Sequence, residues 1–247
     1  MSEPAKARIA IVAALEREVR PLIKNWQVSQ KGRDGRKFRF FEQGDAVLVC
    51  GGIGTAAARR AAEAVIAIYS PARICSAGFA GALDPKLKIG DILQPQRVVN
   101  AADCSSVSLS HGSGVLVSFS SVAGPEQKAK LCDSFSAQAV DMEASAVACA
   151  AEAHGVEFTA VKVISDEADF NFPSMDRFID ERGQFREWKF GAYTAIRPWL
   201  WPSVALLARN SSKASYTLCD HLSKMIASQP DLTLHAARSA SVPGSTR

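Results

Sequence analysis

Runs of apolar residues alternate with alanine-rich stretches through the first two thirds of the chain. Apolar runs rich in β-branched residues and bounded by Gly, Asp or Pro are typical of buried strands. Such runs occupy residues 8–13, 46–50, 73–76, 91–99, 115–119 and 158–164. Residues 55–69 and 142–154 are alanine-rich at helical spacing, and the second stretch stops before Gly155, as helices often do. The pattern predicts an α/β protein.

Strands that are apolar throughout and alternate with helices predict a three-layer α/β/α fold. Its central sheet is expected to be mixed or largely parallel and covered on both faces, with ligand sites at the strand ends. A chain of 247 residues with 47% hydrophobic residues can bury one substantial core. We expect a single domain over residues 1–227. Residues 228–247 lose periodicity and are rich in Ser, Ala and Pro, which predicts a disordered tail.

Composition excludes several classes of protein. The net charge of +4 is spread along the chain without a basic run, so nucleic acid is not an expected partner. The six cysteines form no CxxC pair and no zinc-type spacing, which predicts no disulfide framework, no metal site and a cytoplasmic location. The N-terminus lacks a signal-peptide pattern. The apolar stretch at 199–208 is too short for a bilayer, so no transmembrane segment is predicted.

Carboxylates follow three of the predicted strands. Glu16 and Glu18 come directly after the first, Asp141 and Glu143 stand between a short apolar strand and an alanine-rich helix, and Asp166 ends the apolar run VKVIS. Each acidic residue alone is also explained as a helix cap or as a favourable charge at a helix N-terminus. Carboxylates can activate water or bind sugar hydroxyls. Three strand ends that all deliver them predict a functional site.

Two glycine-rich segments follow strands. Gly52-x-Gly54 in CGGIGTAAA resembles half of a dinucleotide fingerprint, but SAGFAG stands where the acidic residue should end the next strand, so a nicotinamide cofactor is disfavoured. The glycines either let backbone N–H groups approach an anion or sugar, or permit tight packing. We interpret SAGFAG, residues 76–81, as a second glycine-rich turn.

The order of these motifs resembles the nucleoside phosphorylase/nucleosidase superfamily, and most of all its methylthioadenosine/S-adenosylhomocysteine nucleosidase-type members. The likeness rests on IVAALEREV (11–19), GGIGTAAA (51–58), GFAGALDPKLKIGDIL (78–93), VDMEASAVA (140–148) and VISDEAD (163–169). It implies a nucleoside phosphorylase-like fold and an enzyme that cleaves the N-glycosidic bond of a purine nucleoside. It also implies a homodimer and no cofactor, with inorganic phosphate left open as a co-substrate.

The resemblance implies a role for each matching residue. Asp166 matches the aspartate that protonates or hydrogen-bonds the purine ring nitrogen, and Glu18 matches the glutamate that activates the attacking water. Glu143 matches the glutamate that holds the ribose hydroxyls, with Met142 packing beside the sugar. Asp141 is left unassigned. Further substrate contacts are expected from Phe79, Gly54 and Ser165.

Two departures from the family pattern leave the nucleophile open. Phe79 stands where the nucleosidases usually carry a serine, and Ser76 stands where hexameric phosphorylases place a phosphate-binding arginine. Arginines near the first two motifs could bind phosphate instead, although solvated helix faces explain them equally well. These arginines are Arg17, Arg20, Arg59 and Arg60.

Residues 185–214 are similar to the tail of the hopanoid-associated phosphorylase branch, mainly through RPWLWP and LARNS. This likeness implies removal of adenine from adenosylhopane, which leaves a ribosyl-hopanoid. The aromatic cluster in 188–207 is typical of an amphipathic surface element beside an apolar 5′ group, with weak membrane-surface contact; a structural helix covering the sheet is the alternative. A non-catalytic nucleoside-binding protein is the competing function, and retention of Glu18, Glu143 and Asp166 argues against it.

Overall fold

The computed structural model describes residues 9–171 and 197–228. It also describes seven single residues between these ranges, namely Phe178, Asp180, Gly183, Arg186, Lys189, Phe190 and Tyr193. The tail expected at 228–247 therefore lies outside the described residues, apart from Ser228.

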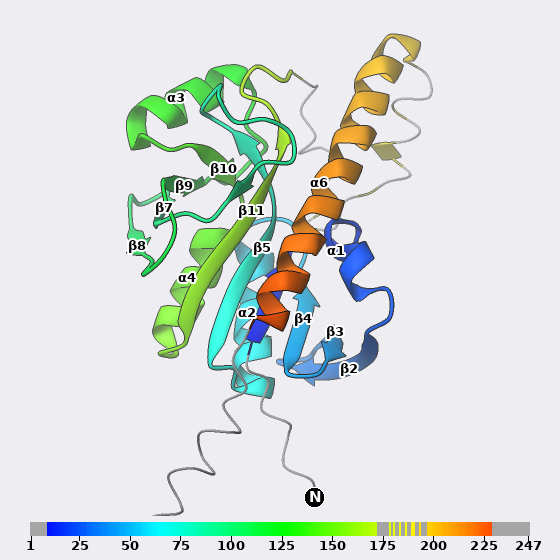
Figure 1. Ribbon diagram of the computed structural model, residues 1–247, viewed down its shortest axis with the longest axis vertical. Coiled ribbons are helices and arrows are strands. Elements are labelled where there is room, and N and C mark those ends of the chain that lie inside the picture. The colour runs from blue at the N-terminus through cyan, green and yellow to red at the C-terminus, as the bar shows by residue number, and fades with distance from the viewer. Residues whose placement is uncertain are drawn as a thin grey trace, which may run out of the picture.

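A mixed β-sheet runs through the centre of the molecule (Figure 1). Its path is β2-β3-β4-β1-β5-β10-β9-β7-β8, and β11 pairs with β5 and β6. β1 is parallel to β4 and β5, and β5 is parallel to β11 but antiparallel to β10. The strands are β1 (Ile9–Ala13), β2 (Gln27–Arg33), β3 (Arg36–Gln43), β4 (Ala46–Cys50), β5 (Arg73–Ala82), β6 (Ile92–Leu93), β7 (Arg97–Asn100), β8 (Ser106–Ser108), β9 (Val115–Ser118), β10 (Ala139–Asp141) and β11 (Glu157–Asp166).

Helices cover both faces of this sheet. They are α1 (Glu16–Ile23), α2 (Thr55–Tyr69), α3 (Pro125–Phe135), α4 (Ala144–Ala153) and α6 (Trp201–Ala227), and a 3-10 turn, η2 (Pro198–Leu200), precedes α6. α2 and α4 share one apolar cluster with alternate residues of β1, whereas α1 and α6 share another with the remaining β1 residues. Because side chains alternate across a strand, the two clusters lie on opposite faces. The predicted three-layer α/β/α fold with a mixed sheet is confirmed.

The C-terminal half of α6 anchors the helix to the sheet. Leu218 and Leu222 are fully buried and stand four residues apart, so they lie on one face of the helix. Burial of each such side chain stabilises the fold by about 1.5–3 kcal/mol. Ser215 Oγ also donates to the backbone carbonyl of Glu18 at 3.0 Å. The helix therefore holds α1 in place as well as covering the sheet.

The expected glycine turn at 76–81 is wrong, because β5 continues through this segment to Ala82. The glycines instead allow close approach. A Cβ at Gly78 would lie 3.0 Å from Glu18 Oε2, and one at Gly81 would lie 2.8 Å from Asp166 Oδ2. Glycine within a strand often marks such a contact.

Other differences from prediction have simple local causes. The strand expected at 91–99 is two strands, β6 and β7, separated by a segment with Pro95, which has no N–H to donate to a ladder. The β2–β3 hairpin was not predicted, although Asp34 and Gly35 both have positive φ and form the Asp-Gly type of two-residue turn. No helix in the described part of the chain is long and apolar enough to cross a membrane.

Candidate active site

A cavity of about 160 Å³ lies where β1, β5, β10 and β11 end. Six of the seven residues predicted for the site line it, and these are Glu18, Phe79, Met142, Glu143, Ser165 and Asp166. Gly54 is not a lining residue, and its backbone N–H donates to Glu143 Oε1 at 2.8 Å. The carboxylates predicted at three strand ends are thus brought to one place.

Glu18 is buried at the start of α1, directly after β1. Its Oε2 atom has no hydrogen-bond partner among the residues that the structure describes. Burial, reinforced by the charge of Glu143, raises the pKa of Glu18 to about 7, even though Lys162 and Arg17 favour the ionised form. A buried carboxylate with an unoccupied oxygen and such a pKa is suited to accept a proton.

Glu143 caps the N-terminus of α4 with its backbone. Its Oε1 atom accepts the N–H of Gly54, and its Oε2 atom accepts the N–H of Met142 at 3.3 Å. Burial and the neighbouring Asp141 raise the pKa of Glu143 to about 7. The glycine segment at 52–54 therefore orients a carboxylate.

A buried ion pair lies beneath these two glutamates. Lys162 Nζ is 2.8 Å from Asp141 Oδ2, and both side chains are almost completely buried. Asp141 also accepts hydrogen bonds from Ser118 Oγ at 2.6 Å and from the Ala144 N–H at 2.8 Å. Burial alone would lower the pKa of Lys162, but the carboxylates of Asp141, Glu143 and Glu18 raise it.

Sequence reasoning left Asp141 unassigned and overlooked Lys162. The available signal was the charged residue inside the apolar run VKVIS, because a lysine in a buried strand requires a partner. The structure gives Asp141 the role of that partner.

Asp166 ends β11 and is held from two sides. Its Oδ1 atom accepts a hydrogen bond from Ser165 Oγ at 2.8 Å, and its Oδ2 atom is ion-paired with Lys128 of α3. Lys128 lines the cavity, yet its side chain is only 3% exposed. Sequence reasoning predicted neither α3 nor Lys128, since nothing in PEQKAKL distinguishes a buried lysine from a solvated one.

A second, polar hollow of about 960 Å³ shares Ala14, Leu15 and Arg17 with the cavity wall. Its basic lining is Arg17, Arg20, Arg36, Lys37, Arg39 and Arg60, and Glu16 is ion-paired with Arg39 at 2.8 Å. Arg59 is not part of it and pairs with Glu63 at 2.9 Å. The excess of positive charge suits an anion.

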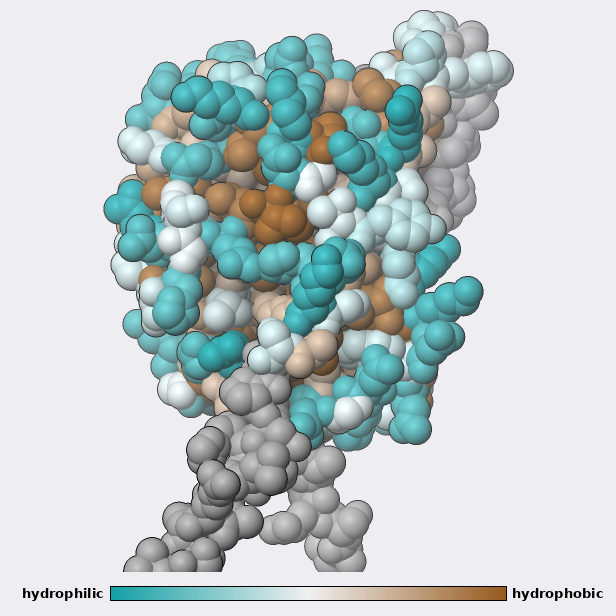
Figure 2. Space-filling model, viewed as in Figure 1, coloured by the Kyte–Doolittle hydropathy of each residue, from teal (hydrophilic) through white to brown (hydrophobic). Residues whose placement is uncertain are grey.

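The N-terminal half of α6 projects away from the sheet (Figure 1). Trp199 and Trp201 are 70% and 57% exposed, and Leu206 is exposed too. None of the described residues in 197–207 lines the cavity, and Trp188 lies outside the described residues. Hydrophobic residues on the face seen in Figure 2 gather only in small, separate areas.

The chain matches a family model and several known proteins. The family model for the phosphorylase superfamily matches residues 8–118 and 111–188. The chain is similar to the 5′-methylthioadenosine/S-adenosylhomocysteine nucleosidase of Staphylococcus aureus strain JH9, with 29% identity over 206 residues that cover 66% of this chain and 90% of the relative. The Buchnera aphidicola nucleosidase of the same name is 28% identical over 165 residues, which cover 53% and 71%.

Solved structures share the fold. The 5′-methylthioadenosine/S-adenosylhomocysteine nucleosidase of Helicobacter pylori superposes with a TM-score of 0.67 at 19% identity, covering 90% of this chain and 98% of that one. Futalosine hydrolase of Helicobacter pylori superposes with a TM-score of 0.68 at 19% identity, covering 90% and 97%.

The buried glutamates predict a stability that falls as pH rises. Glu18 and Glu143 have ordinary pKa values of 4.5 and folded values of about 7, so the folded chain binds more protons than the unfolded chain between these limits. The free energy of unfolding should therefore decrease through this window. Glu18→Gln removes one such ionisation and should stabilise the protein by about 2–3 kcal/mol at pH 8, with little effect at pH 4.

Urea denaturation at both pH values measures this difference. Glu16→Gln is the matched control, because Glu16 lies in the same turn of α1 but is 40% exposed. A Glu18→Gln gain that is equal at pH 4 and pH 8 would show that ionisation of Glu18 does not oppose folding.

Proposed function

Since the chain belongs to the phosphorylase superfamily, we propose that it cleaves the N-glycosidic bond of an adenosine-like purine nucleoside and releases adenine. The observation that carries the proposal is the convergence of Glu18, Glu143 and Asp166 on one cavity, each in a different environment. Carboxyl groups whose surroundings differ in this way can take different roles in one reaction.

Asp166 is assigned to the purine. When an N-glycosidic bond breaks, negative charge accumulates on the departing base, and a hydrogen bond or proton at a ring nitrogen stabilises that charge. The Asp166 side chain is 26% exposed at the cavity, whereas its Lys128 partner is buried behind it. Ser165 fixes the orientation of the carboxylate.

Glu143 and Met142 are assigned to the sugar. The ribosyl group becomes oxocarbenium-like in the transition state, so nearby anionic groups stabilise its developing positive charge. Two backbone N–H groups hold the Glu143 carboxylate in a fixed orientation. Phe79 lines the same cavity and offers an apolar wall.

Glu18 is assigned to the nucleophile, which we propose is water. Its pKa of about 7 lies near neutral pH, where a general base is most effective. Phosphorolysis is the second candidate, and the basic hollow that shares Arg17 with the cavity is the observation that favours it. Phosphate would then enter from that hollow.

The finer proposal is that the 5′ substituent is apolar, as in adenosylhopane. Its support is the RPWLWP and LARNS likeness together with two exposed rings, Trp199 in η2 and Trp201 at the projecting start of α6. The proposal requires that an alkyl chain leaving the cavity reach these rings. The homodimer implied by the family resemblance stays a prediction.

Asp166→Asn should lower adenine release from adenosine or methylthioadenosine by ~10²–10⁴, because Asn forms hydrogen bonds but cannot transfer a proton. Chromatographic detection of adenine measures this. Near-normal turnover by the variant would refute the assignment of Asp166. A wild-type protein that binds these nucleosides but releases no adenine would instead be a non-catalytic binding module.

Glu18→Gln should chiefly lower kcat if water is the nucleophile, with little change in KM. The sugar product should be free sugar whether or not phosphate is present. Identification of sugar 1-phosphate, with full activity of Glu18→Gln in phosphate, would overturn hydrolysis in favour of phosphorolysis.

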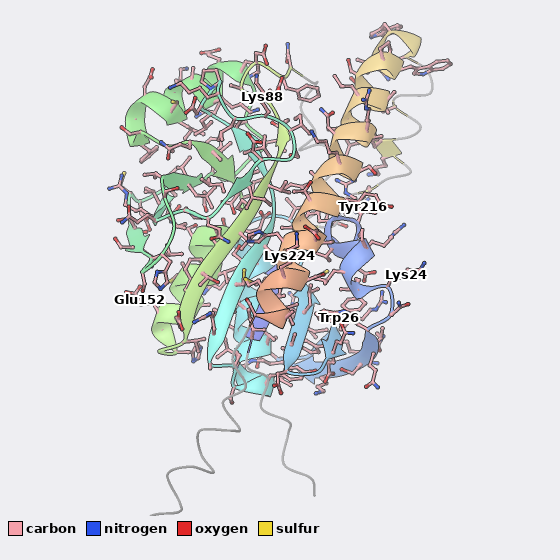
Figure 3. The ribbon with its side chains drawn as sticks, viewed as in Figure 1. Lys24, Trp26, Lys88, Glu152, Tyr216 and Lys224 are labelled. Carbon is pink, nitrogen blue, oxygen red and sulfur yellow. The ribbon has the colours of Figure 1, made fainter. Side chains whose placement is uncertain are left out.

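Trp199→Ala and Trp201→Ala should each weaken kcat/KM for a long-chain 5′-alkyl adenosine by about tenfold, corresponding to loss of ~1.4 kcal/mol of apolar contact. Methylthioadenosine should be unaffected. Tyr216→Ala is the matched control, because Tyr216 is an exposed aromatic residue farther along α6 (Figure 3). Equal losses on both substrates, with early melting, would make the segment structural.

A further inference from the structure

Lys128 is an unusual residue for the place that it occupies. The buried residues of α3 are Lys128 and Leu131, so this helix turns a charged side chain as well as an apolar one toward the protein. Replacing a whole buried ion pair by hydrophobic residues of similar volume is often neutral or stabilising. Packing alone therefore gives no reason for a lysine.

The ammonium group of Lys128 contacts Asp166 and the residue that follows it. Its ammonium group is ion-paired with Asp166 Oδ2 and donates to the backbone carbonyl of Glu167 at 2.6 Å. An ammonium group has three N–H donors and no acceptor. Lys128 therefore brings protons to the carboxylate assigned to the purine.

The hydrogen bonds of Asp166 show where a proton can come from. Oδ1 accepts from Ser165 Oγ, and Oδ2 accepts from Lys128. Each oxygen of the carboxylate therefore has a donor within hydrogen-bond distance. The ammonium of Lys128 is the acidic group in direct contact with it.

The other charged groups around the Lys128–Asp166 pair lie next to Asp166 in the chain, on α3 and across the cavity. The Glu167 side chain lies 3.5 Å from Lys88, which is labelled in Figure 3 at the same end of the molecule as α3. On α3 itself, Glu126 pairs with Lys130 at the surface and Asp133 is exposed. Across the cavity are Glu18, Glu143 and Arg17, with the Asp141–Lys162 pair beneath.

We propose that Lys128 supplies, through Asp166, the proton that the departing purine requires. This inference rests on the proposed function. As the bond between the sugar carbon and the base nitrogen breaks, its electron pair passes to the base. One proton passes from Lys128 Nζ to the Asp166 carboxylate and from there to a purine ring nitrogen, so that Lys128 becomes a neutral amine and Asp166 is again a carboxylate. The amine regains a proton from water after adenine leaves.

The test compares two leaving groups. Adenine requires a proton to leave, whereas the 4-nitrophenolate of 4-nitrophenyl β-D-riboside does not. Lys128→Met should lower kcat/KM for adenosine by ~10²–10³ and for the nitrophenyl riboside by less than about threefold. Lys128→Arg should also lose adenosine cleavage, because a guanidinium keeps the charge but does not give up a proton. Lys130→Met is the control, since Lys130 is on the same helix but 65% exposed.

Chemical rescue provides the second measurement. Lys128→Ala should recover adenosine cleavage when n-propylamine is added at a pH where the amine is protonated, and the control variant should not respond. Recovery by the amine is not expected of a residue that only supports the fold. Melting temperatures of all variants accompany the kinetics.

Each outcome has a separate meaning. Any one of three results would overturn the inference: equal losses on both leaving groups without amine rescue, full activity of Lys128→Arg, or unchanged kinetics of Lys128→Met. Adenine release by the wild-type protein would still uphold the proposed function in each of these cases. Wild-type protein that releases no purine from any nucleoside would overturn the proposed function, and the inference with it.

Discussion

The buried ammonium of Lys162 is the charge on which the rest of the site depends. It lies 2.8 Å from Asp141, and its positive charge acts on Glu143 and Glu18 as well. Several carboxylates buried around one cavity would repel one another without a cation among them. Removing one partner of such a pair typically costs 3–5 kcal/mol, because the other charge is left uncompensated. The pair therefore makes a dense group of acids compatible with a folded chain.

Two glycines of β5 allow the carboxylates of Glu18 and Asp166 to lie against this strand. Gly78 and Gly81 leave no room for a Cβ beside the carboxylates of Glu18 and Asp166, so the strand passes directly beneath both. On the far side of the cavity, the N–H of Gly54 fixes Glu143. Glycines that looked like turn residues thus serve the placement of carboxylates, which is a constraint that only the folded structure reveals.

Periodic segments were predictable, and irregular ones were not. The strand at 46–50 and the helix at 55–69 were found because a continuous apolar run and an alanine-rich stretch at helical spacing are local properties of the sequence. The hairpin β2–β3 is largely polar, so it contains no such apolar run. Glu18, Glu143 and Asp166 were found because they follow strands within recognisable motifs. Lys128 and Lys162 were missed because their burial depends on carboxylates distant in the sequence.

The arrangement of charge matches the proposed reaction from end to end. Toward the sugar, the buried carboxyls of Glu18 and Glu143 have raised pKa values, so their negative charge is only partly offset and can respond to a developing cation. Toward the purine, the cation of Lys128 stands behind Asp166, where negative charge develops. Negative charge at the sugar end and a proton donor at the purine end stabilise the transition state more than the neutral substrate. The unfavourable burial of the two glutamates is then the stability cost of this arrangement of charge.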